Sequence, residues 1–243
     1  MLEDIRGKVA LVTGASRGIG RAAALAFARE GTQVVVTART QDQLDSLVKD
    51  CQDMGVKAVA IAADAANADD VKRLKSEALN AFDQIDIVVN NAGVAKYGTL
   101  LEHTVEEYYW MMNTNMRSTF LCTHAFLPEM LERKSGSIII VSSQAGYNGF
   151  AGETVYCATK FAQVGFAEGL DREVREKNIK VSVIAPGGVR TTFAFGTGRT
   201  EDMPQLAGML EAESVADAIV YAARQSPESR ILVVGMRPMS ESS

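Results

Sequence analysis

The sequence predicts an α/β protein: a doubly wound parallel sheet between two layers of helices, three layers in all, folded as a single domain. Apolar runs of strand length alternate with amphipathic stretches of helical length along nearly the whole chain. The run at 8–13 lacks the polar alternation of a sheet with one exposed face, which indicates a parallel strand buried on both faces, and we expect 179–185 to be another buried strand. Small, turn-forming residues follow several of these runs, at the edge where such sheets bind ligands.

The expected elements follow one another in regular order. We expect strands at 8–13, 33–38, 57–62, 85–89, 137–141, 179–185 and 230–234, and helices at 19–30, 41–54, 69–82, 105–133, 154–177 and 214–224. The segment 105–133 is too long for one ordinary surface helix, and Asn115 in its middle is either a tolerated surface amide or a functional break. The segment 193–204 has the composition of a mobile lid.

Composition limits the partners of the protein. With 243 residues and 47% hydrophobic content, the chain can bury roughly 70 to 75% of its unfolded surface in one core. The net charge of −5 argues against a nucleic acid or an anionic membrane as the main partner. Without a signal peptide or a membrane-length apolar run, we expect a soluble, cytoplasmic protein. Three scattered cysteines without metal-ligand spacing predict reduced thiols and no metal.

A candidate acid/base site lies between Ser142 and Lys160. A strand-like run ends at Ser142 and Ser143, and Tyr156 and Lys160 share one face of the following helix because they are four positions apart. A phenol titrates near pH ~10, so using it as a proton donor at neutral pH requires a shift of about 3 units, or roughly 4 kcal/mol. An ammonium about 4 Å away, at an effective dielectric of about 20, supplies about that much. The Y-x-x-x-K motif alone is common, so this interpretation depends on its neighbours.

A glycine-rich turn, T-G-A-S-R-G-I-G from Thr13 to Gly20, joins the first strand to the first helix. Strand, glycine turn and helix in this order form a phosphate cradle, since glycines let backbone N–H groups approach a pyrophosphate at the positive end of the helix dipole. The spacing is GxxxGxG rather than GxGxxG. The surrounding strand and helix, more than the glycines, indicate nucleotide binding in a Rossmann fold.

The end of the second strand favours NADP over NAD. An NAD site commonly has an acidic residue here for the ribose 2′-hydroxyl, whereas this chain has Ala38 followed by Arg39 and Thr40. An arginine would give a 2′-phosphate charge-assisted hydrogen bonds worth about 1.5 to 3 kcal/mol each, and Arg17 in the glycine turn could reach the same group. The alternative for Arg39 is a solvated loop charge.

Two more strand ends carry candidate ligand-binding residues. Asp64 could hold the edge of an adenine ring, or it could cap the helix that follows. The strand at 85–89 leads into N-N-A-G, which again places turn-forming residues at the carboxyl edge of the sheet.

Together these motifs resemble one family. T-G-A-S-R-G-I-G, N-N-A-G, the mid-helix Asn115, S-S before a loop, Y-C-A-T-K and P-G-G-V-R-T occur in the order of the short-chain dehydrogenases/reductases of about this length. The resemblance covers nearly the whole chain. It implies one Rossmann-type domain, with a cofactor half at roughly 1–95 and a catalytic and substrate half at roughly 96–243.

The resemblance also implies roles for particular residues. Tyr156 would donate a proton to a carbonyl in reduction and accept one in oxidation, while Lys160 would lower the pKa of Tyr156 and bind the nicotinamide ribose. Ser143, thirteen positions before Tyr156, would orient the carbonyl in preference to Ser142, and Asn115 would hold a water in a proton relay through Lys160. Besides Tyr156 and Lys160, the residues implied in NADP(H) binding are Gly14, Ser16, Arg17, Ile19, Gly20, Arg39, Thr40, Asp64, Ala65, Asn91, Ala92, Gly93, Pro186, Gly187, Val189 and Thr191.

The activity implied by the resemblance is reversible, NADP(H)-dependent hydride transfer between the nicotinamide and a small carbonyl or secondary alcohol substrate. The likeness further implies a homotetramer, or a homodimer, built through the long helices. Bacterial 3-oxoacyl-acyl-carrier-protein reductases usually end in a V-D-G-G-like stretch, and this chain has V-V-G-M-R-P at 233–238, so that substrate class is kept as an alternative. The motifs also leave open a non-catalytic NADP(H)-sensing protein and an enzyme that prefers NAD.

The substrate pocket is the least defined part of the sequence. An apolar, partly aromatic wall could be formed by Gln144, Tyr147, Phe150, Phe193 and Phe195, although core packing explains any one of them equally well. Lys96 and Arg190 are the candidates for binding a substrate carboxylate.

Overall fold

The computed structural model describes residues 2–241 and contains one sheet of seven strands. The strand order is β3-β2-β1-β4-β5-β6-β7, and every neighbouring pair is parallel. The strands are β1 (Val9–Thr13), β2 (Gln33–Ala38), β3 (Ala58–Ala62), β4 (Ile87–Asn90), β5 (Gly136–Val141), β6 (Ile179–Pro186) and β7 (Val233–Met236). The order reverses between β1 and β4, so a crevice for ligands is expected at their carboxyl ends.

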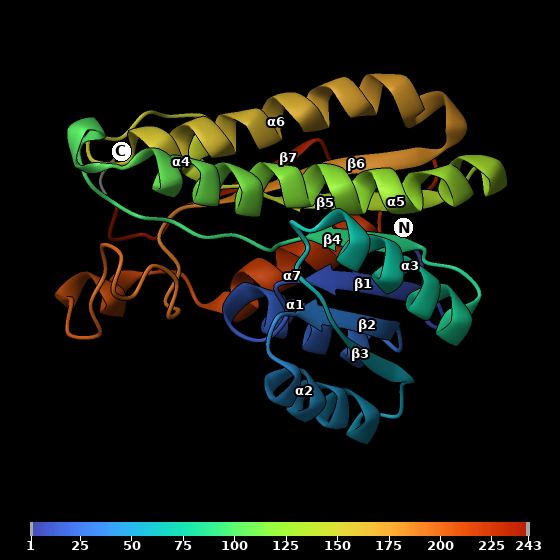
Figure 1. Ribbon diagram of the computed structural model, residues 1–243. Coiled ribbons are helices and arrows are strands. Elements are labelled where there is room, and N and C mark those ends of the chain that lie inside the picture. Colours follow the sequence, from blue (N-terminus) through green and yellow to red (C-terminus); the bar gives the residue numbers. More distant parts are fainter. Residues whose placement is uncertain (1, 242–243) are drawn as a thin grey trace.

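Helices cover both faces of the sheet. They are α1 (Gly18–Arg29), α2 (Gln41–Asp53), α3 (Ala68–Phe82), α4 (Val105–Met112), α5 (Ser118–Arg133), α6 (Thr154–Val174) and α7 (Ala212–Ala223). α1, α2 and α7 pack on one face, and α3, α5 and α6 pack on the other (Figure 1). The predicted doubly wound, three-layer sheet is therefore confirmed. Within residues 2–241, no helix combines the length and the apolar character needed to span a bilayer.

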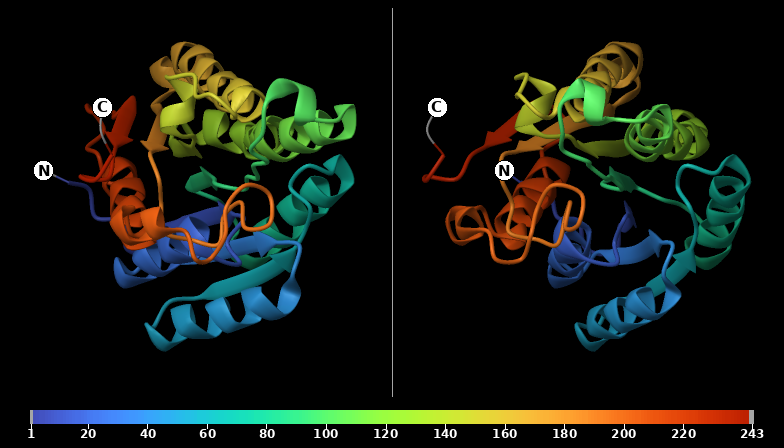
Figure 2. Two further views of the ribbon diagram at one scale, coloured as in Figure 1. Left: turned by 90° about the vertical axis from the view of Figure 1, so that its left-hand side faces the viewer. Right: turned by 60° about the vertical axis from the view of Figure 1, so that its left-hand side comes forward.

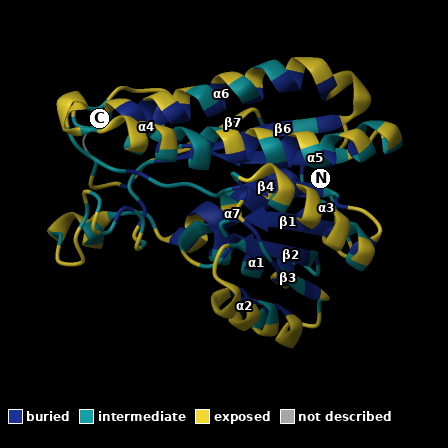
Figure 3. Cartoon of the chain, in the orientation of Figure 1, coloured by how far each residue is buried: buried dark blue, intermediate teal, exposed yellow. Residues whose placement is uncertain are grey.

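The sheet separates two apolar cores. Because side chains alternate along a strand, Ala10 and Val12 of β1 point into the core beneath α1 and α7, whereas Val9 and Leu11 point into the core beneath α3, α5 and α6. The central strands β1, β4, β5 and β6 are buried on both faces, whereas the edge strand β7 is partly exposed, and the outer surfaces of the helices are exposed (Figure 3). This pattern explains why the strand sequences are almost continuously apolar.

The segment predicted as helical at 105–133 is helical throughout, but it is not one regular α-helix. A π-helical turn (Asn113–Arg117) separates α4 from α5, and Asn115 within the turn is fully buried. The interpretation of Asn115 as a surface amide is therefore wrong. Elsewhere most boundaries agree within one or two residues, but β7 begins at Val233 instead of residue 230.

The chain between β6 and α7 runs in front of the carboxyl edge of the sheet, where Figure 2 shows it in orange. It is fastened to the segment after β4 by two hydrogen bonds. The amide of Tyr97 donates to the carbonyl of Thr197 at 2.8 Å, and the Thr197 hydroxyl donates to the carbonyl of Ala95 at 2.7 Å. The segment that resembled a lid in sequence is thus held across the ligand edge of the sheet.

Candidate active site

A cavity of about 880 Å³ extends along the carboxyl edge of the sheet. It joins the glycine turn after β1 to the beginning of α6, so the predicted cofactor and acid/base residues lie around one space. Of the predicted site residues, the cavity wall contains Gly14, Ser16, Arg17, Ile19, Arg39, Thr40, Asp64, Ala65, Asn91, Ala92, Gly93, Ser143, Tyr156, Lys160, Pro186, Gly187, Val189 and Thr191. Gly20 and Asn115 lie behind the wall.

The glycine turn packs directly against the loop after β4. Gly14 has a positive φ of 62°, and a Cβ atom there would lie 2.8 Å from the Cα of Ala92. The side-chain amide of Asn91 donates to the carbonyls of Thr13 (2.9 Å) and Gly14 (3.2 Å). The Thr13 hydroxyl accepts hydrogen bonds from the amides of Asn91 and Ala92, both at 3.0 Å. Thr13 thus ties β1 to the β4 loop, a role that the sequence did not suggest.

Gly20 differs from its expected role. It is buried, and a Cβ atom there would lie 2.4 Å from the Gly14 carbonyl oxygen and 2.5 Å from the Asn91 amide nitrogen. The close approach of α1 to the turn therefore requires this glycine. Gly20 lets α1 pack closely against the glycine turn, but it does not line the cavity.

Gly20→Ala should lower the free energy of unfolding by about 2 to 3 kcal/mol, because backbone atoms would have to move to admit the methyl group. Thermal and urea unfolding would measure the loss. Gly149→Ala is the matched control, since none of the described atoms lies within 4 Å of its added Cβ; its stability should stay within about 0.5 kcal/mol of the wild type. Equal stability of the two variants would contradict the steric argument.

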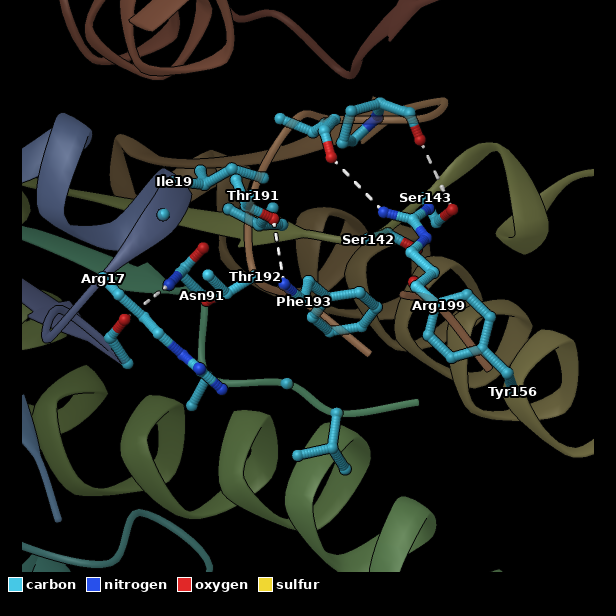
Figure 4. A pocket seen from close by; sticks show the side chains of 18 of the residues that line it. Arg17, Ile19, Asn91, Ser142, Ser143, Tyr156, Thr191, Thr192, Phe193 and Arg199 are labelled. Carbon is cyan, nitrogen blue, oxygen red and sulfur yellow. Dashed lines mark hydrogen bonds between the residues drawn. The ribbon is translucent and has the colours of Figure 1, made fainter. Parts of the chain in front are cut away.

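Tyr156 lies in the first turns of α6 and is only 7% exposed. Its ring is surrounded by Tyr97 and Phe193, whose centroids each lie 6.1 Å from the Tyr156 centroid. Figure 4 shows Tyr156, Ser143 and Arg199 at one end of the cavity and Arg17 and Asn91 toward the other. The Ser143 hydroxyl accepts from the amide of Ala145 (3.1 Å) and donates to the carbonyl of Pro186 (3.3 Å).

Ser142 and Ser143 occupy different environments. The Ser142 hydroxyl donates to the backbone carbonyl of Lys160 at 3.2 Å, and Ser142 is buried. Ser143 is partly exposed in the cavity and belongs to the neighbourhood of the Tyr156 hydroxyl. The environment thus favours Ser143 for contact with a ligand.

Lys160 is 4% exposed and lies 5.7 Å from the centroid of the Tyr156 ring, measured at its Nζ atom. The ammonium donates to the carbonyl of Val141 (3.0 Å) and to the side-chain oxygen of Gln163 (2.9 Å). Within the described part of the chain no carboxylate offsets the effect of burial, which lowers the pKa of Lys160 to about 7. Nothing in the sequence connects Gln163 with the site.

The pKa of Tyr156 moves in the opposite direction from the sequence expectation. Burial raises the pKa of the phenol, because the phenolate would lose its hydration, and the neighbouring Tyr97 adds to the rise. The Ser143 hydroxyl and the positive charge of Arg199 act in the lowering direction. Burial, which the helical spacing of Tyr156 and Lys160 does not reveal, is here the largest influence on the pKa of Tyr156.

Asn115 holds together three segments behind the cavity. Its side-chain oxygen accepts from the amide of Val94 (2.8 Å), and its side-chain nitrogen donates to the Val94 carbonyl and the Thr159 hydroxyl, both at 2.9 Å. Its backbone carbonyl accepts from the Gln163 amide at 2.9 Å. Asn115 therefore fixes α6 relative to the β4 loop, and its carbonyl reaches Lys160 through Gln163.

Two exposed arginines mark the opposite end of the cavity. Arg17 and Arg39 form no ion pair within 4 Å among the described residues. Asp64 lines the cavity nearby and accepts from the amide of Ala66 at 3.0 Å. The N-cap of α3 is Asn67, so the interpretation of Asp64 as that cap is wrong.

The substrate end of the cavity differs from the sequence expectation in its charged residues. Lys96 is paired with Glu107 and Arg190 with Glu211, so neither candidate cation is unpaired. Arg199, in contrast, lines the cavity and has no acidic partner within 4 Å in the described range 2–241. Of the predicted wall residues, Gln144, Phe150 and Phe193 line the cavity, whereas Tyr147 and Phe195 do not.

A family model described as short chain dehydrogenase matches residues 8–202 of the chain. The chain belongs to this family. Membership makes it an oxidoreductase that acts on C=O or CH–OH groups, and it confirms the family resemblance carried by the motifs.

Two relatives illustrate the range of the family. A 3-oxoacyl-[acyl-carrier-protein] reductase of Synechocystis sp. is 40% identical over 188 residues, which cover 77% of this chain and 76% of that protein. A sepiapterin reductase of Chlorobaculum tepidum is 34% identical over 239 residues, covering 96% of each. Similarity to the second relative thus extends over a larger share of the chain.

Solved structures share the complete fold. An alcohol dehydrogenase from the archaeon Thermococcus sibiricus, complexed with 5-hydroxy-NADP, has a TM-score of 0.90 at 27% identity, covering 98% of this chain and 99% of that chain. A metagenomic short-chain oxidoreductase in complex with NADP has a TM-score of 0.85 at 31% identity, covering 98% of this chain and 100% of that chain.

Proposed function

We propose that the protein is an NADP(H)-dependent oxidoreductase that transfers hydride reversibly between the nicotinamide and a carbonyl or secondary alcohol, with Tyr156 as the acid/base. The observation that carries the proposal is one continuous cavity, which joins the glycine turn and the arginines at its far end to Ser143, Tyr156 and Lys160. Both solved structures described above hold NADP or a hydroxylated form of it.

The residues of the cavity fit NADP(H). α1 begins at the glycine turn without a side-chain cap and without an acidic residue in its first turn, so its free amides can receive a pyrophosphate. Arg39, with Arg17, would hold the 2′-phosphate, and Thr40 lies beside them. Asp64 and Ala65 would contact the adenine, and Asn91, Ala92 and Gly93 the adenosine ribose. Pro186, Gly187, Val189 and Thr191 would line the nicotinamide carboxamide.

The chemistry assigned to the chain is proton transfer and charge stabilisation at one oxygen atom. NADPH, when bound, supplies the hydride. Ser143 and Tyr156 would donate hydrogen bonds to the substrate oxygen and stabilise the negative charge that develops there, and the Tyr156 hydroxyl would give its proton to that oxygen. Lys160 would support the phenolate that remains, and Asn115 keeps the surrounding backbone in place. A carbonyl would be reduced in this direction, and a secondary alcohol oxidised in the other.

Arg199 indicates the substrate class that this site would favour. Its guanidinium contacts the carbonyl of Val189 (3.3 Å) and lies 5.8 Å from the Tyr97 ring centroid. Glu153 is an acidic residue of the cavity wall, and the charge of Arg199 acts on it. Burial raises the pKa of Glu153, so its carboxylate competes less with a substrate anion for Arg199. A substrate with a carboxylate near its carbonyl group would give Arg199 an anionic partner.

Arg199→Met should raise KM for short 2-oxo and 3-oxo acids about 10- to 100-fold, because one charge-assisted pair is lost. KM for neutral ketones of the same size should change about twofold or less. Initial rates of NADPH consumption would measure both. Arg190→Met is the matched control, because Arg190 is paired with Glu211 outside the cavity wall. If KM rises equally for neutral and anionic substrates, Arg199 holds the loop in place and does not select the substrate.

A substrate screen tests the proposed function directly. Purified protein would be incubated with NADPH and a panel of oxo acids, oxoacyl thioesters, diketones, quinones and ketosteroids, and NADPH loss would be followed by absorbance. We expect consumption with at least one class. A folded protein that binds NADPH but consumes it with none of these compounds would support an NADP(H)-sensing role instead.

A second candidate is reduction of 3-oxoacyl groups carried on acyl carrier protein. It is favoured by the 40% identity to a relative of that name, although that alignment covers 77% of this chain. Oxoacyl thioesters in the screen separate the two candidates.

The exposed surface of the long helices supports the proposed homotetramer or homodimer. Tyr109 on α4, Phe120 on α5 and Phe161 on α6 are exposed. Burying such a surface between copies would remove apolar area from water. Light scattering on the purified protein would give the number of subunits.

A further inference from the structure

The position of Lys160 depends on one amide that lies outside the cavity wall. A lysine ammonium has three hydrogens to donate. One goes to the Val141 carbonyl at the end of β5, and a second goes to the side-chain oxygen of Gln163, nearly one turn further along α6. Lys160 itself lines the cavity, so the third hydrogen is left for a ligand.

Gln163 is fully buried, and its amide has a defined orientation. Its nitrogen donates to the Asn115 carbonyl and to the Thr119 hydroxyl, both at 2.9 Å. That hydroxyl already donates its own hydrogen to the Asn115 carbonyl at 2.8 Å, so toward Gln163 it can only accept. Reversing the amide would set its oxygen against two acceptors and its nitrogen against the ammonium. Only the observed orientation satisfies every partner, and it presents an oxygen to Lys160.

The π-helical turn positions Asn115, the residue to which the Gln163 amide is bound. The turn shifts the register of the helix at Asn115. The backbone carbonyl of Asn115 accepts two side-chain hydrogen bonds, one from Thr119 and one from Gln163. The side chain of Gln163 therefore spans the distance from the turn to Lys160 with two hydrogen bonds and no intervening group.

We propose that Gln163 is a positioning residue for the reaction: it fixes the ammonium of Lys160 and links it to the π-helical turn at Asn115. Among the described residues, the neighbours of this ammonium besides Gln163 include the Val141 carbonyl from β5, the Tyr156 ring on α6, and Gly93 from the β4 loop, whose added Cβ would lie 3.8 Å from the Lys160 Nζ. Tyr156 is the one titratable group among them. Gln163 thus supplies the side-chain acceptor for the charged form of Lys160.

A purely structural role makes a different prediction from a positioning role. If Gln163 only fills the core, replacing it changes stability and leaves the protonation of Lys160 unchanged. If its oxygen stabilises the ammonium, removing that oxygen favours the neutral amine. Gln163→Met keeps the length and approximate volume of the side chain and removes its hydrogen bonds. Gln163→Asn keeps the amide on a shorter side chain, which cannot reach both Lys160 and the Asn115 carbonyl.

The decisive experiment is an NMR titration of the full chain labelled at its lysine side chains, with Lys160→Met used to assign the Lys160 signal. In the wild type the pKa of Lys160 should be about 7. In Gln163→Met and Gln163→Asn it should fall by about one unit, since a lost hydrogen bond to a charged group is of that size. No substrate or cofactor is needed, so the result stands apart from the proposed function.

Activity provides a second readout. Lys160 is proposed to act as the ammonium, so kcat/KM for carbonyl reduction should fall as pH rises through the pKa of Lys160. In Gln163→Met this falling limb of the pH profile should lie at lower pH than in the wild type. Gln225→Leu, which removes another buried glutamine amide far along the chain, should leave the limb in place. Folded Gln163 variants that keep the wild-type Lys160 pKa would overturn the proposal. If Gln163→Met does not fold, Gln163→Asn carries the same test.

Discussion

Tyr156→Phe should lower kcat for carbonyl reduction about 10³-fold while the Kd for NADPH changes by less than about threefold, because proton transfer by a positioned group contributes a factor of this size. The substitution removes one oxygen atom. The ring would keep its contacts with Tyr97 and Phe193, so the wall of the cavity remains. Single-turnover rates with a substrate found in the screen, and fluorescence titration with NADPH, would separate the two quantities.

Tyr221→Phe is the matched control for this experiment. Tyr221 lies on α7, is half exposed and does not line the cavity, so loss of its hydroxyl should leave kcat unchanged. If Tyr156→Phe retained more than about a tenth of wild-type kcat, Tyr156 would not be the proton donor, because even a modest general acid is worth more than that. A parallel loss of NADPH affinity would instead indicate a damaged cavity.

The fold could be predicted because its signals are local. Runs such as 9–12 and 138–141 are apolar on both faces, and this property depends only on neighbouring residues in the chain. Glycine turns and small residues at the strand ends then marked the ligand edge. The same logic placed Ser143, Tyr156 and Lys160 around one cavity, since the last two share a helix face and the first follows β5.

The errors concern contacts between distant parts of the chain. The residues around Asn115 left a surface amide open as an alternative, because nothing near it in sequence indicates that α6 and the Val94 loop enclose it; only the family resemblance implied a role for it. Arg199 lies in a segment of lid-like composition, and its cavity position depends on hydrogen bonds that join the loop to Ala95 and Tyr97. Charge alone could not separate it from Lys96 and Arg190, which have acidic partners on other segments.

The error about the pKa of Tyr156 has a different origin. Spacing on a helix correctly placed Lys160 and Tyr156 near each other, but the effect of one charge on another was estimated without the burial of both groups. Burial raises the pKa of the phenol and lowers that of the ammonium, so each opposes the charge that the simple argument required. Spacing predicts neighbours; the depth of the site determines their protonation.

Arg39→Ala should raise KM for NADPH about 10- to 100-fold, as expected for losing one or two charge-assisted hydrogen bonds to a 2′-phosphate, and should change KM for NADH by about twofold or less. Arg39 is exposed and lines the cavity at the end of β2, and its removal would break no ion pair among residues 2–241. Steady-state kinetics with both cofactors would measure the ratio. The effect should diminish at high salt, because the contact is exposed to solvent.

Arg29→Ala removes the same charge from an exposed position at the end of α1 and should alter neither KM, which controls for the change in net charge. The double variant Arg17→Ala, Arg39→Ala should lose more NADPH affinity than Arg39→Ala alone if both guanidinium groups contact the same phosphate. Wild-type protein that uses NADH as well as NADPH, with equal effects of Arg39→Ala on both, would mean that Arg39 is a solvated loop charge. In that case Ala38, which has no carboxylate, would allow both cofactors to bind. It can neither accept a hydrogen bond from the 2′-hydroxyl of NADH nor repel the 2′-phosphate of NADPH.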